Sequence, residues 1–220
     1  MELPHRVIWA LAFTGVGLLP TKAIAQANHP AQMTGVCECV GCHGTHRWAA
    51  KVEDQQAPPS IPQDHKVTPS DIAGWNGPGG VFRKKSPRRG RELEWFELTG
   101  TVTHLKADDD GDLHLQLVDA AAPATAVNVI VEIPEGPPWC ELRERVFGWT
   151  KAHFPLTVTG GQVLKLKVRP TVRVVGRAFY DAANAAKGNT ASNRRRAVGK
   201  DVIAALWEIH PVMNLTVVHQ

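Results

Sequence analysis

The sequence predicts a mainly β protein built around one small barrel, and three observations support this prediction. First, residues 93–220 contain five segments in which apolar and polar side chains alternate, as they do in strands with one buried face. Second, one segment with helical spacing separates the third strand from the fourth. Third, the resulting order β-β-β-α-β-β is that of the OB-fold, a five-stranded Greek-key barrel. We therefore expect an OB-like barrel, and a meander packed against one helix is the alternative.

The alternation is clearest in the second predicted strand. Three leucines at every second position from 113 to 117 point one way, and Asp112, His114 and Gln116 point the other. The turn residues Asp109-Asp110-Gly111 precede this strand and are typical of a hairpin, whose tip we expect to be solvated. The predicted main strands are residues 94–106, 112–118, 127–133, 171–181 and 206–218, with a short edge strand at 164–168.

One helix and two glycines complete the predicted barrel. Residues 139–152 have helical spacing, with Leu142 and Val146 in one apolar stripe. Gly100 and Gly176 lie inside the first and fourth strands, where a small barrel needs sharp bends.

Turn-forming residues dominate residues 26–92, which precede the barrel. The proline-rich residues 57–62 cannot form a helix or an inner strand, because proline lacks the amide donor and fixes φ. Residues 68–72 (Thr-Pro-Ser-Asp-Ile) can start one short helical turn. Six Arg and Lys residues between positions 83 and 91 indicate a solvated basic loop, with a phosphate-binding patch as the alternative. We expect residues 26–92 to form an irregular arm tied to the barrel by a disulfide.

Residues 1–25 have the features of a cleavable secretory signal peptide. Arg6 precedes a run of 13 mostly apolar residues, 7–19, which is too short to cross a bilayer as a helix. Ala23-Ile24-Ala25 supplies the small residues that signal peptidase needs at −3 and −1. Cleavage after Ala27 or an uncleaved anchor are the alternatives. No later segment reaches 18 apolar residues, so we expect a periplasmic or secreted protein with no transmembrane segment in the mature chain.

Charge and motifs restrict the functional classes. The formal net charge is +4, of which residues 1–25 contribute +1, so the mature chain is only mildly basic and gives weak support for a nucleic-acid partner. The sequence contains neither a Gly-x-Ser-x-Gly elbow nor a phosphate-binding glycine loop between a strand and a helix.

All four cysteines follow the predicted signal peptide. Three of them, Cys37, Cys39 and Cys42, lie within six residues, and Cys140 is the fourth. An even number of cysteines in an oxidising compartment favours disulfides, and we expect Cys140 to pair with one of the other three.

The spacing of Cys39, Cys42 and His43 also matches the CxxCH pattern of covalent haem attachment. In that alternative two thiols bond the haem and the histidine binds its iron, while Cys37 is left to pair with Cys140. A zinc site made of cysteine and histidine is a further alternative.

Four side chains on the predicted strands are candidate ligands of a divalent metal ion. Asp112 and His114 share one face of the second strand, Glu132 lies on the third strand, and His210 lies on the last strand. Carboxylates and imidazoles can hold such an ion or transfer protons. The alternative is the ordinary polar, solvated face of an antiparallel sheet.

OB barrels commonly bind ligands across their second and third strands. The outward residues that we expect on this binding face are Trp95, Thr101, Thr103, Gln116 and Asn128.

Four short segments resemble a group of uncharacterised exported bacterial proteins. They are Arg47-Trp48-Ala49-Ala50-Lys51, residues 110–115, residues 131–134 and residues 207–212, which correspond to RWxxK, DxHL, EIP and E(I/L)HPV motifs. Members of this group tend to have one cysteine just before RWxxK and another after the EIP segment. The resemblance therefore implies a Cys42–Cys140 disulfide, which would count against haem, and it implies no established activity.

Three functions remain open from the sequence. The first is an exported, disulfide-stabilised OB-like module that binds an unknown ligand or protein partner. The second is a metal-dependent, nuclease-like hydrolase that uses Asp112, His114, Glu132 and His210. The third is electron transfer by a covalent haem c. The hydrolase requires the side chains of His114, Glu132 and His210 to converge, and it fails if His210 lies across the barrel from His114.

Overall fold

The fold is described by a computed structural model. It describes residues 32–33, 37–40, 44, 46–121, 127–151, 158–185, 188–194 and 204–220, so the predicted signal peptide and its cleavage site lie outside the described residues.

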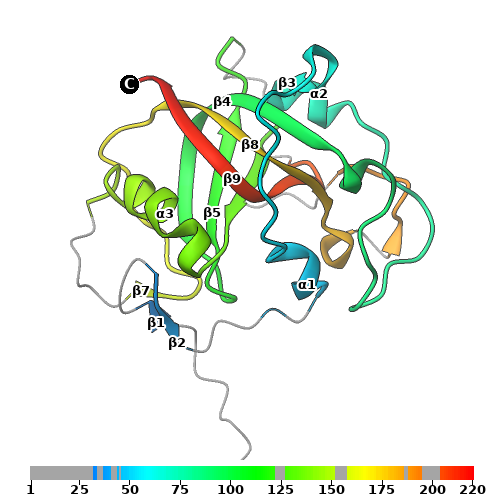
Figure 1. Ribbon diagram of the computed structural model, residues 1–220, viewed down its shortest axis with the longest axis horizontal. Helices are drawn as coiled ribbons and strands as arrows, with labels where there is room; N and C mark the ends of the chain where they lie inside the picture. Colours follow the sequence, from blue (N-terminus) through cyan, green and yellow to red (C-terminus); the bar gives the residue numbers. More distant parts are fainter. Residues whose placement is uncertain are drawn as a thin grey trace, which may run out of the picture.

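Five strands close into a barrel, as the sequence predicts (Figure 1). Their order around the barrel is β4-β5-β6-β9-β8, and β8 pairs with β4 to close it. β6 and β9 run parallel, whereas the other neighbours are antiparallel. The strands are β4 (Trp95–Ala107), β5 (Leu113–Val118), β6 (Val129–Ile133), β8 (Thr171–Tyr180) and β9 (Trp207–His219).

One helix separates the third barrel strand from the fourth. It is α3 (Cys140–Phe147), and the 3-10 turn η3 (Pro137–Trp139) precedes it. It is shorter than the predicted helix because the chain turns at Gly148 and Trp149. The predicted edge strand at residues 164–168 is wrong, since only isolated bridges form there, at Val163 and Leu166.

The barrel interior follows the predicted alternation. In β4, Phe96, Leu98 and Val102 are buried, and the side chains between them are half-buried. Gly176 allows β8 and β9 to approach closely, because a Cβ atom there would lie 2.4 Å from the carbonyl oxygen of Pro211. The pairing of β8 with β9 shifts register on both sides of this glycine.

Short elements of the arm pack on the barrel. β3 pairs in parallel with β4, and α2 begins with Pro69 and a capping box formed by Thr68 and Asp71, as expected of residues 68–72. A separate small sheet has the order β2-β1-β7. These elements are β1 (Gln32–Met33), β2 (Cys39–Val40), α1 (Trp48–Lys51), η1 (Gln63–His65), β3 (Lys66–Val67), α2 (Pro69–Ala73), η2 (Gly90–Leu93), β7 (Val158–Thr159) and η4 (Ala182–Asn184).

A buried ion pair and a disulfide attach the arm to the barrel. Arg47 adopts a left-handed backbone conformation (φ 55°), which is uncommon for a residue with a side chain. Its guanidinium contacts both carboxylate oxygens of Glu92, at 2.6 and 2.7 Å. Glu92 also accepts a hydrogen bond from the backbone amide of Tyr180 in β8 (2.9 Å).

The disulfide joins Cys37 to Cys140, so the pairing of Cys42 with Cys140 implied by the resemblance is wrong. The Cα atoms of Cys37 and Cys140 lie 5.0 Å apart, within the usual range for a disulfide, and each thiol forms only one such bond. Cys42 and the side chain of Cys39 lie outside the described residues.

The basic run is only partly solvated. Arg83, Lys84 and Lys85 are exposed as expected, but Arg88 is buried against the barrel. Within the described part of the chain, no helix is long and apolar enough to cross a membrane.

Candidate metal centre

Strand pairing brings the four predicted metal ligands to one outer face of the barrel. His114 of β5 lies directly opposite Glu132 of β6. β6 and β9 pair in parallel next to these positions, which puts His210 beside Glu132. Asp112 lies just before β5, at the end of the hairpin loop.

The side chains of Asp112, Glu132 and His210 converge. His210 Nδ1 lies 2.8 Å from Glu132 Oε2, and His210 Nε2 lies 3.2 Å from Asp112 Oδ2. One candidate ligand atom from each residue lies within 4.8 Å of the others, and all three residues are buried. The condition set for the metal-dependent alternative is therefore met in part: both histidines contact Glu132 from the same side of the barrel, but His114 and His210 belong to two different groups of candidate ligands among the described residues.

Several of these buried atoms have no hydrogen-bond partner within the described residues. They are both carboxylate oxygens of Asp112, Oε2 of Glu132 and both ring nitrogens of His210. The short contacts of the His210 ring are at ion-pair distance but do not have hydrogen-bond geometry. An unsatisfied buried polar group costs about 1–3 kcal/mol, and buried charges are usually paired or bound to metal. The carboxylate oxygens among them therefore retain the lone pairs that a metal ion needs, and the His210 ring offers one lone pair in its neutral form.

A second group of candidate ligands shares Glu132. His114 Nδ1 is hydrogen-bonded to Glu132 Oε1 (2.9 Å) and lies 3.3 Å from Asp108 Oδ2. Candidate ligand atoms of these three residues also lie within 4.8 Å of one another. Each oxygen of Glu132 thus faces a different histidine, and the His114 contact fixes the orientation of the carboxylate.

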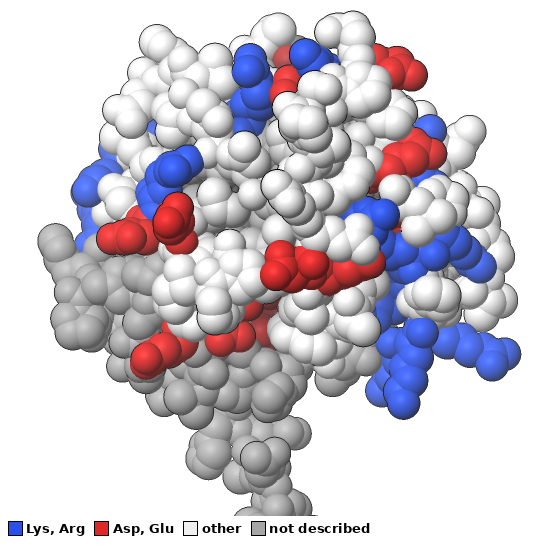
Figure 2. Space-filling view, viewed as in Figure 1, with Lys and Arg blue, Asp and Glu red and all other residues white. Residues whose placement is uncertain are grey.

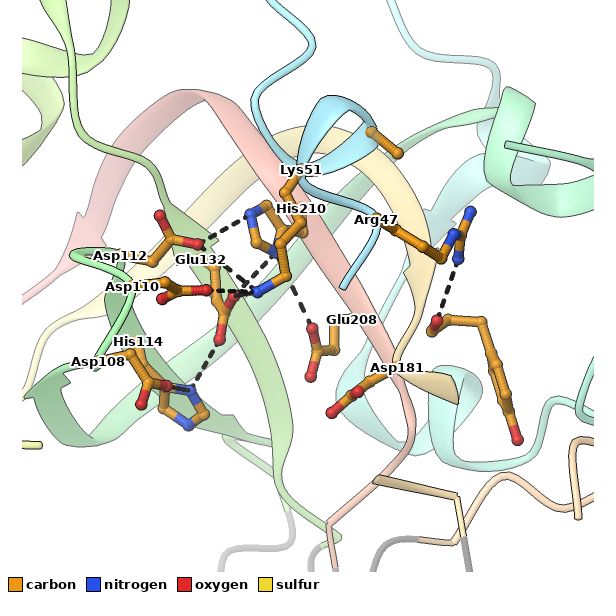
Figure 3. Close-up of polar contacts among 12 residues, drawn as sticks. Arg47, Lys51, Asp108, Asp110, Asp112, His114, Glu132, Asp181, Glu208 and His210 are labelled. Carbon is orange, nitrogen blue, oxygen red and sulfur yellow. Dashed lines mark hydrogen bonds and ion pairs between the residues drawn. The ribbon is translucent and has the colours of Figure 1, made fainter. Parts of the chain in front are cut away.

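Lys51 reaches into the acidic cluster from α1 (Figure 3). Its ammonium donates a hydrogen bond to Asp110 Oδ2 (2.8 Å). It lies 3.6 Å from Glu132 Oε2 and 3.8 Å from Asp112 Oδ2, which is beyond hydrogen-bond distance. These two oxygens are among the atoms that lack a hydrogen bond.

The environment of the cluster raises the pKa of some of its members and lowers the pKa of others. Burial raises the pKa of Asp112. Burial acts the same way on Glu132, but Lys51 and His210 hold its pKa well below the usual range. Burial alone would lower the pKa values of His210 and Lys51, but the neighbouring carboxylates raise both.

Asp108 is shifted in the same direction as Glu132. Burial opposes its ionisation, yet hydrogen bonds with His114 and Lys106 lower the pKa of Asp108 to about 2.

The arm covers this face of the barrel, so the expected solvated polar face is wrong here. Asp112 and His210 are fully buried, and His114 is 2 % exposed. Arg88 links the arm to the site, because its guanidinium donates to the carbonyl of Ala50 in α1 and to the carbonyl of His210 (2.6 Å). Burial lowers the pKa of Arg88 to about 10, so the guanidinium stays charged at neutral pH.

A cleft of about 580 Å³ opens beside the cluster. Lys51, Asp110 and Glu132 line it, whereas Asp112 and His210 are not among its lining residues. The exposed residues Arg83 and Lys84 also line it. On the face drawn in Figure 2, acidic side chains gather in the lower half, and a group of basic side chains lies to their right. Further acidic residues of the lining are Asp108, Asp109, Asp181 and Glu208.

The residues predicted to form a binding face lie elsewhere on the barrel, and none of the five lines this cleft. Thr103 Oγ1 donates hydrogen bonds to the Gln116 carbonyl (3.2 Å) and to Asn128 Oδ1 (3.4 Å). The Thr101 hydroxyl contacts that of Thr171 (2.9 Å). The ring of Trp95 lies under the guanidinium of Arg177. The alternation of apolar and polar residues predicts that these side chains point outward. It does not predict which part of the outer surface the loops shape into a cleft.

The CxxCH residues lie outside the described part of the chain, apart from the backbone of Cys39 and Val40. The observed disulfide joins Cys37 to Cys140. This is the pairing that covalent haem attachment at Cys39 and Cys42 would leave possible. Haem and Cys/His zinc therefore stay predictions of the sequence.

Sequence reasoning missed three members of the cluster. The RWxxK motif contains Lys51 without giving it a role, and the turn residues Asp109-Asp110-Gly111, which follow Asp108, predict a solvated hairpin tip. The side chains of Lys51, Asp108 and Asp110 are only 16, 26 and 20 % exposed, respectively. The run of aspartates directly before Asp112 and His114 is the sequence feature that could have indicated a role for Asp108 and Asp110 in the cluster.

A mixed carboxylate and imidazole site of this kind suits ions such as Mn²⁺ and Zn²⁺. Such an ion can activate water or polarise a phosphoryl or carbonyl oxygen. Comparisons with protein-family models, curated proteins and solved structures give no match for this chain.

Proposed function

We propose that this protein is a divalent-metal-dependent hydrolase whose active site is the cluster of Asp112, Glu132 and His210 beside the cleft. The observation that carries the proposal is the convergence of these three buried side chains with carboxylate oxygens that lack hydrogen bonds. A purely structural polar cluster would be expected to satisfy those oxygens. His114 is the positioning residue for Glu132, through its contact at 2.9 Å.

The cleft supports a phosphate ester as the substrate class. Arg83 and Lys84 line the same cleft as Glu132, so an anionic group could contact these cations and the metal ion together. The ion would lower the pKa of a bound water and polarise the phosphoryl oxygen. Nucleic acid is one member of this class, in keeping with the nuclease-like alternative from the sequence.

The test is a titration of the folded protein with Mn²⁺ and with Zn²⁺ by calorimetry. It is followed by hydrolysis of bis(p-nitrophenyl) phosphate in the presence of the ion that binds. We expect saturable binding at one site and metal-dependent release of nitrophenolate. Asp112→Asn should weaken metal binding at least about 100-fold and abolish hydrolysis, because it removes an anionic ligand and leaves the shape of the side chain.

The matched control is Asp119→Asn, which makes the same change at an exposed carboxylate that accepts a hydrogen bond from Ser70. This variant should bind the ion as the wild type does. Absence of saturable binding in the wild type, or equal binding by Asp112→Asn, would refute the proposal. Metal binding without hydrolysis of the ester would refute the proposed enzymatic activity and would instead support a metal-binding module.

A second candidate function is ligand binding without catalysis. The cleft beside the OB-like barrel favours it, since small barrels of this type bind ligands on an outer face and its loops. Binding of inorganic phosphate that is independent of metal and unchanged in Asp112→Asn would favour this function over hydrolysis.

The Cys37–Cys140 disulfide supports export to the periplasm or beyond, because such bonds persist in oxidising compartments. A covalent haem is a separate proposal from the sequence. A Soret band and a mass gain of one haem in the purified protein would support it, and a colourless preparation would exclude it.

A further inference from the structure

Lys51 occupies a distinctive place in the candidate metal centre. Among the described residues its ammonium makes one hydrogen bond, to Asp110, yet it lies near the unsatisfied oxygens of both Asp112 and Glu132. At 3.8 and 3.6 Å it offsets their negative charge without using their lone pairs. An ammonium at that distance balances charge but leaves the coordination positions open.

A divalent ion shared by Asp112 and Glu132 would come within a few ångströms of this ammonium. Like charges that close repel strongly in a buried site, so the two cations disfavour each other there. Lys51 has space to move into, because its side chain also lines the cleft. A four-carbon stem lets the ammonium move by rotamer changes alone.

The backbone that carries Lys51 is held in place. Arg47, at the start of α1, is fixed by its two-oxygen contact with Glu92. The carbonyl of Ala50 accepts a hydrogen bond from Arg88, which also binds the carbonyl of His210. These anchors restrict any rearrangement to the Lys51 side chain and keep the helix in its place beside the barrel.

We propose that Lys51 is an internal counter-ion that stands in for the metal ion, and that metal binding displaces its ammonium from Asp112 and Glu132 into the cleft. This inference rests on the proposed metal centre and adds a residue that sets its affinity. It also gives the centre two states: one in which the Lys51 ammonium lies beside Asp112 and Glu132, and one in which the ion binds these carboxylates and the ammonium lies in the cleft.

The first test compares Mn²⁺ affinity in the wild type and in Lys51→Met. Removal of the competing charge should tighten Mn²⁺ binding at least tenfold. It should also enlarge the rise in thermal midpoint that Mn²⁺ produces, because the metal-free variant has lost the counter-ion of its buried carboxylates. Lys51→Arg keeps the charge and should not bind more tightly than the wild type.

The control is Lys66→Met, which removes the same charge from an exposed position in β3. Lys66 is not among the residues that line the cleft. This variant should bind Mn²⁺ within about threefold of the wild type. Equal affinities in Lys51→Met and the wild type would overturn the inference.

A second measurement needs no variant. Lysine acylation by a soluble N-hydroxysuccinimide ester, followed by peptide mass spectrometry, reports how freely Lys51 reacts in the wild-type protein. Saturation with Mn²⁺ should increase labelling of Lys51 several-fold and leave that of the exposed Lys66 unchanged. Unchanged or reduced labelling of Lys51 in the Mn²⁺-saturated protein would overturn the inference while leaving the metal centre intact. If neither the wild type nor Lys51→Met binds Mn²⁺, the proposed centre itself fails.

Discussion

Glu92 and Arg47 show how strongly single residues determine the placement of the arm. Glu92 is fully buried, and its two oxygens meet the Arg47 guanidinium and the backbone amide of Tyr180. Removal of one member of such a pair leaves the other charge buried without compensation. The attachment of the arm to the barrel therefore depends on a buried ion pair in which each charge needs the other.

We predict that Glu92→Gln lowers the free energy of unfolding by about 3–5 kcal/mol. Arg47 would keep its burial but lose its counter-charge, and the check is urea denaturation followed by tryptophan fluorescence. Glu97→Gln is the control, because Glu97 pairs with the half-exposed Arg173 at 3.5 Å. That pair should contribute less than about 1 kcal/mol. A similar loss of unfolding free energy in both variants would show that the buried pair stabilises the fold no more than the exposed pair does.

Local sequence patterns predict some residues of the candidate site and not others. Asp112, His114, Glu132 and His210 were identified because alternation puts them on the outer face of their strands. Lys51 could not be identified in this way, since the contact between Lys51 and Asp110 spans 59 positions and no local pattern reports it.

At the scale of elements, the contact between β8 and β9 positions one of the three residues of the candidate centre, His210. The two strands approach closely at Gly176, where a side chain would overlap the carbonyl of Pro211. His210 directly precedes Pro211, so the packing at Gly176 fixes the position of the histidine.

We predict that Gly176→Ala destabilises the protein by about 1–3 kcal/mol, because the new methyl group must displace the backbone of β9. Mn²⁺ affinity should fall as well, since His210 would move with that backbone. Chemical denaturation and calorimetry measure the two effects.

The control is Gly74→Ala at the end of α2, where the nearest atom to a new Cβ would lie 3.4 Å away. We expect Gly74→Ala to change stability by less than about 1 kcal/mol. Wild-type stability in Gly176→Ala would mean that β9 can shift without cost.

The strands were the most predictable elements. Each of the five barrel strands lies within two residues of its expected bounds, because alternating apolar side chains fit a sheet with one buried face. The predicted edge strand at residues 164–168 is wrong, because the described chain forms only the single bridges Val163–Lys106 and Leu166–Thr150 there, and apolar composition alone does not produce a continuous ladder.

At the scale of the whole molecule, the disulfide ties the start of the arm to α3 across 103 positions of the chain. Closing a loop of that length stabilises the fold by about 4–5 kcal/mol in the chain-entropy account. The double variant Cys37→Ser/Cys140→Ser should therefore unfold at a markedly lower denaturant concentration.

The cysteine map of the purified protein tests the pairing directly. A glutamate-specific protease cuts after Glu38 and so separates Cys37 from Cys39 and Cys42. Under non-reducing conditions we expect a linked pair of peptides, one ending at Glu38 and one covering residues 136–141. A link from Cys140 to the peptide with Cys42 would instead support the pairing that the resemblance implies.

Local patterns in the sequence are sufficient to predict the five strands, the order of strands and helix along the chain, and the outward orientation of four candidate ligands. These features follow from local periodicity, which reports whether a side chain faces the core. Tertiary structure alone decided that the arm buries this outer face, that Lys51 enters the acidic cluster, and that Cys37 is the partner of Cys140. Each of these is a contact between segments far apart in the chain. Packing and charge compensation select such contacts, and no spacing rule along the sequence encodes them.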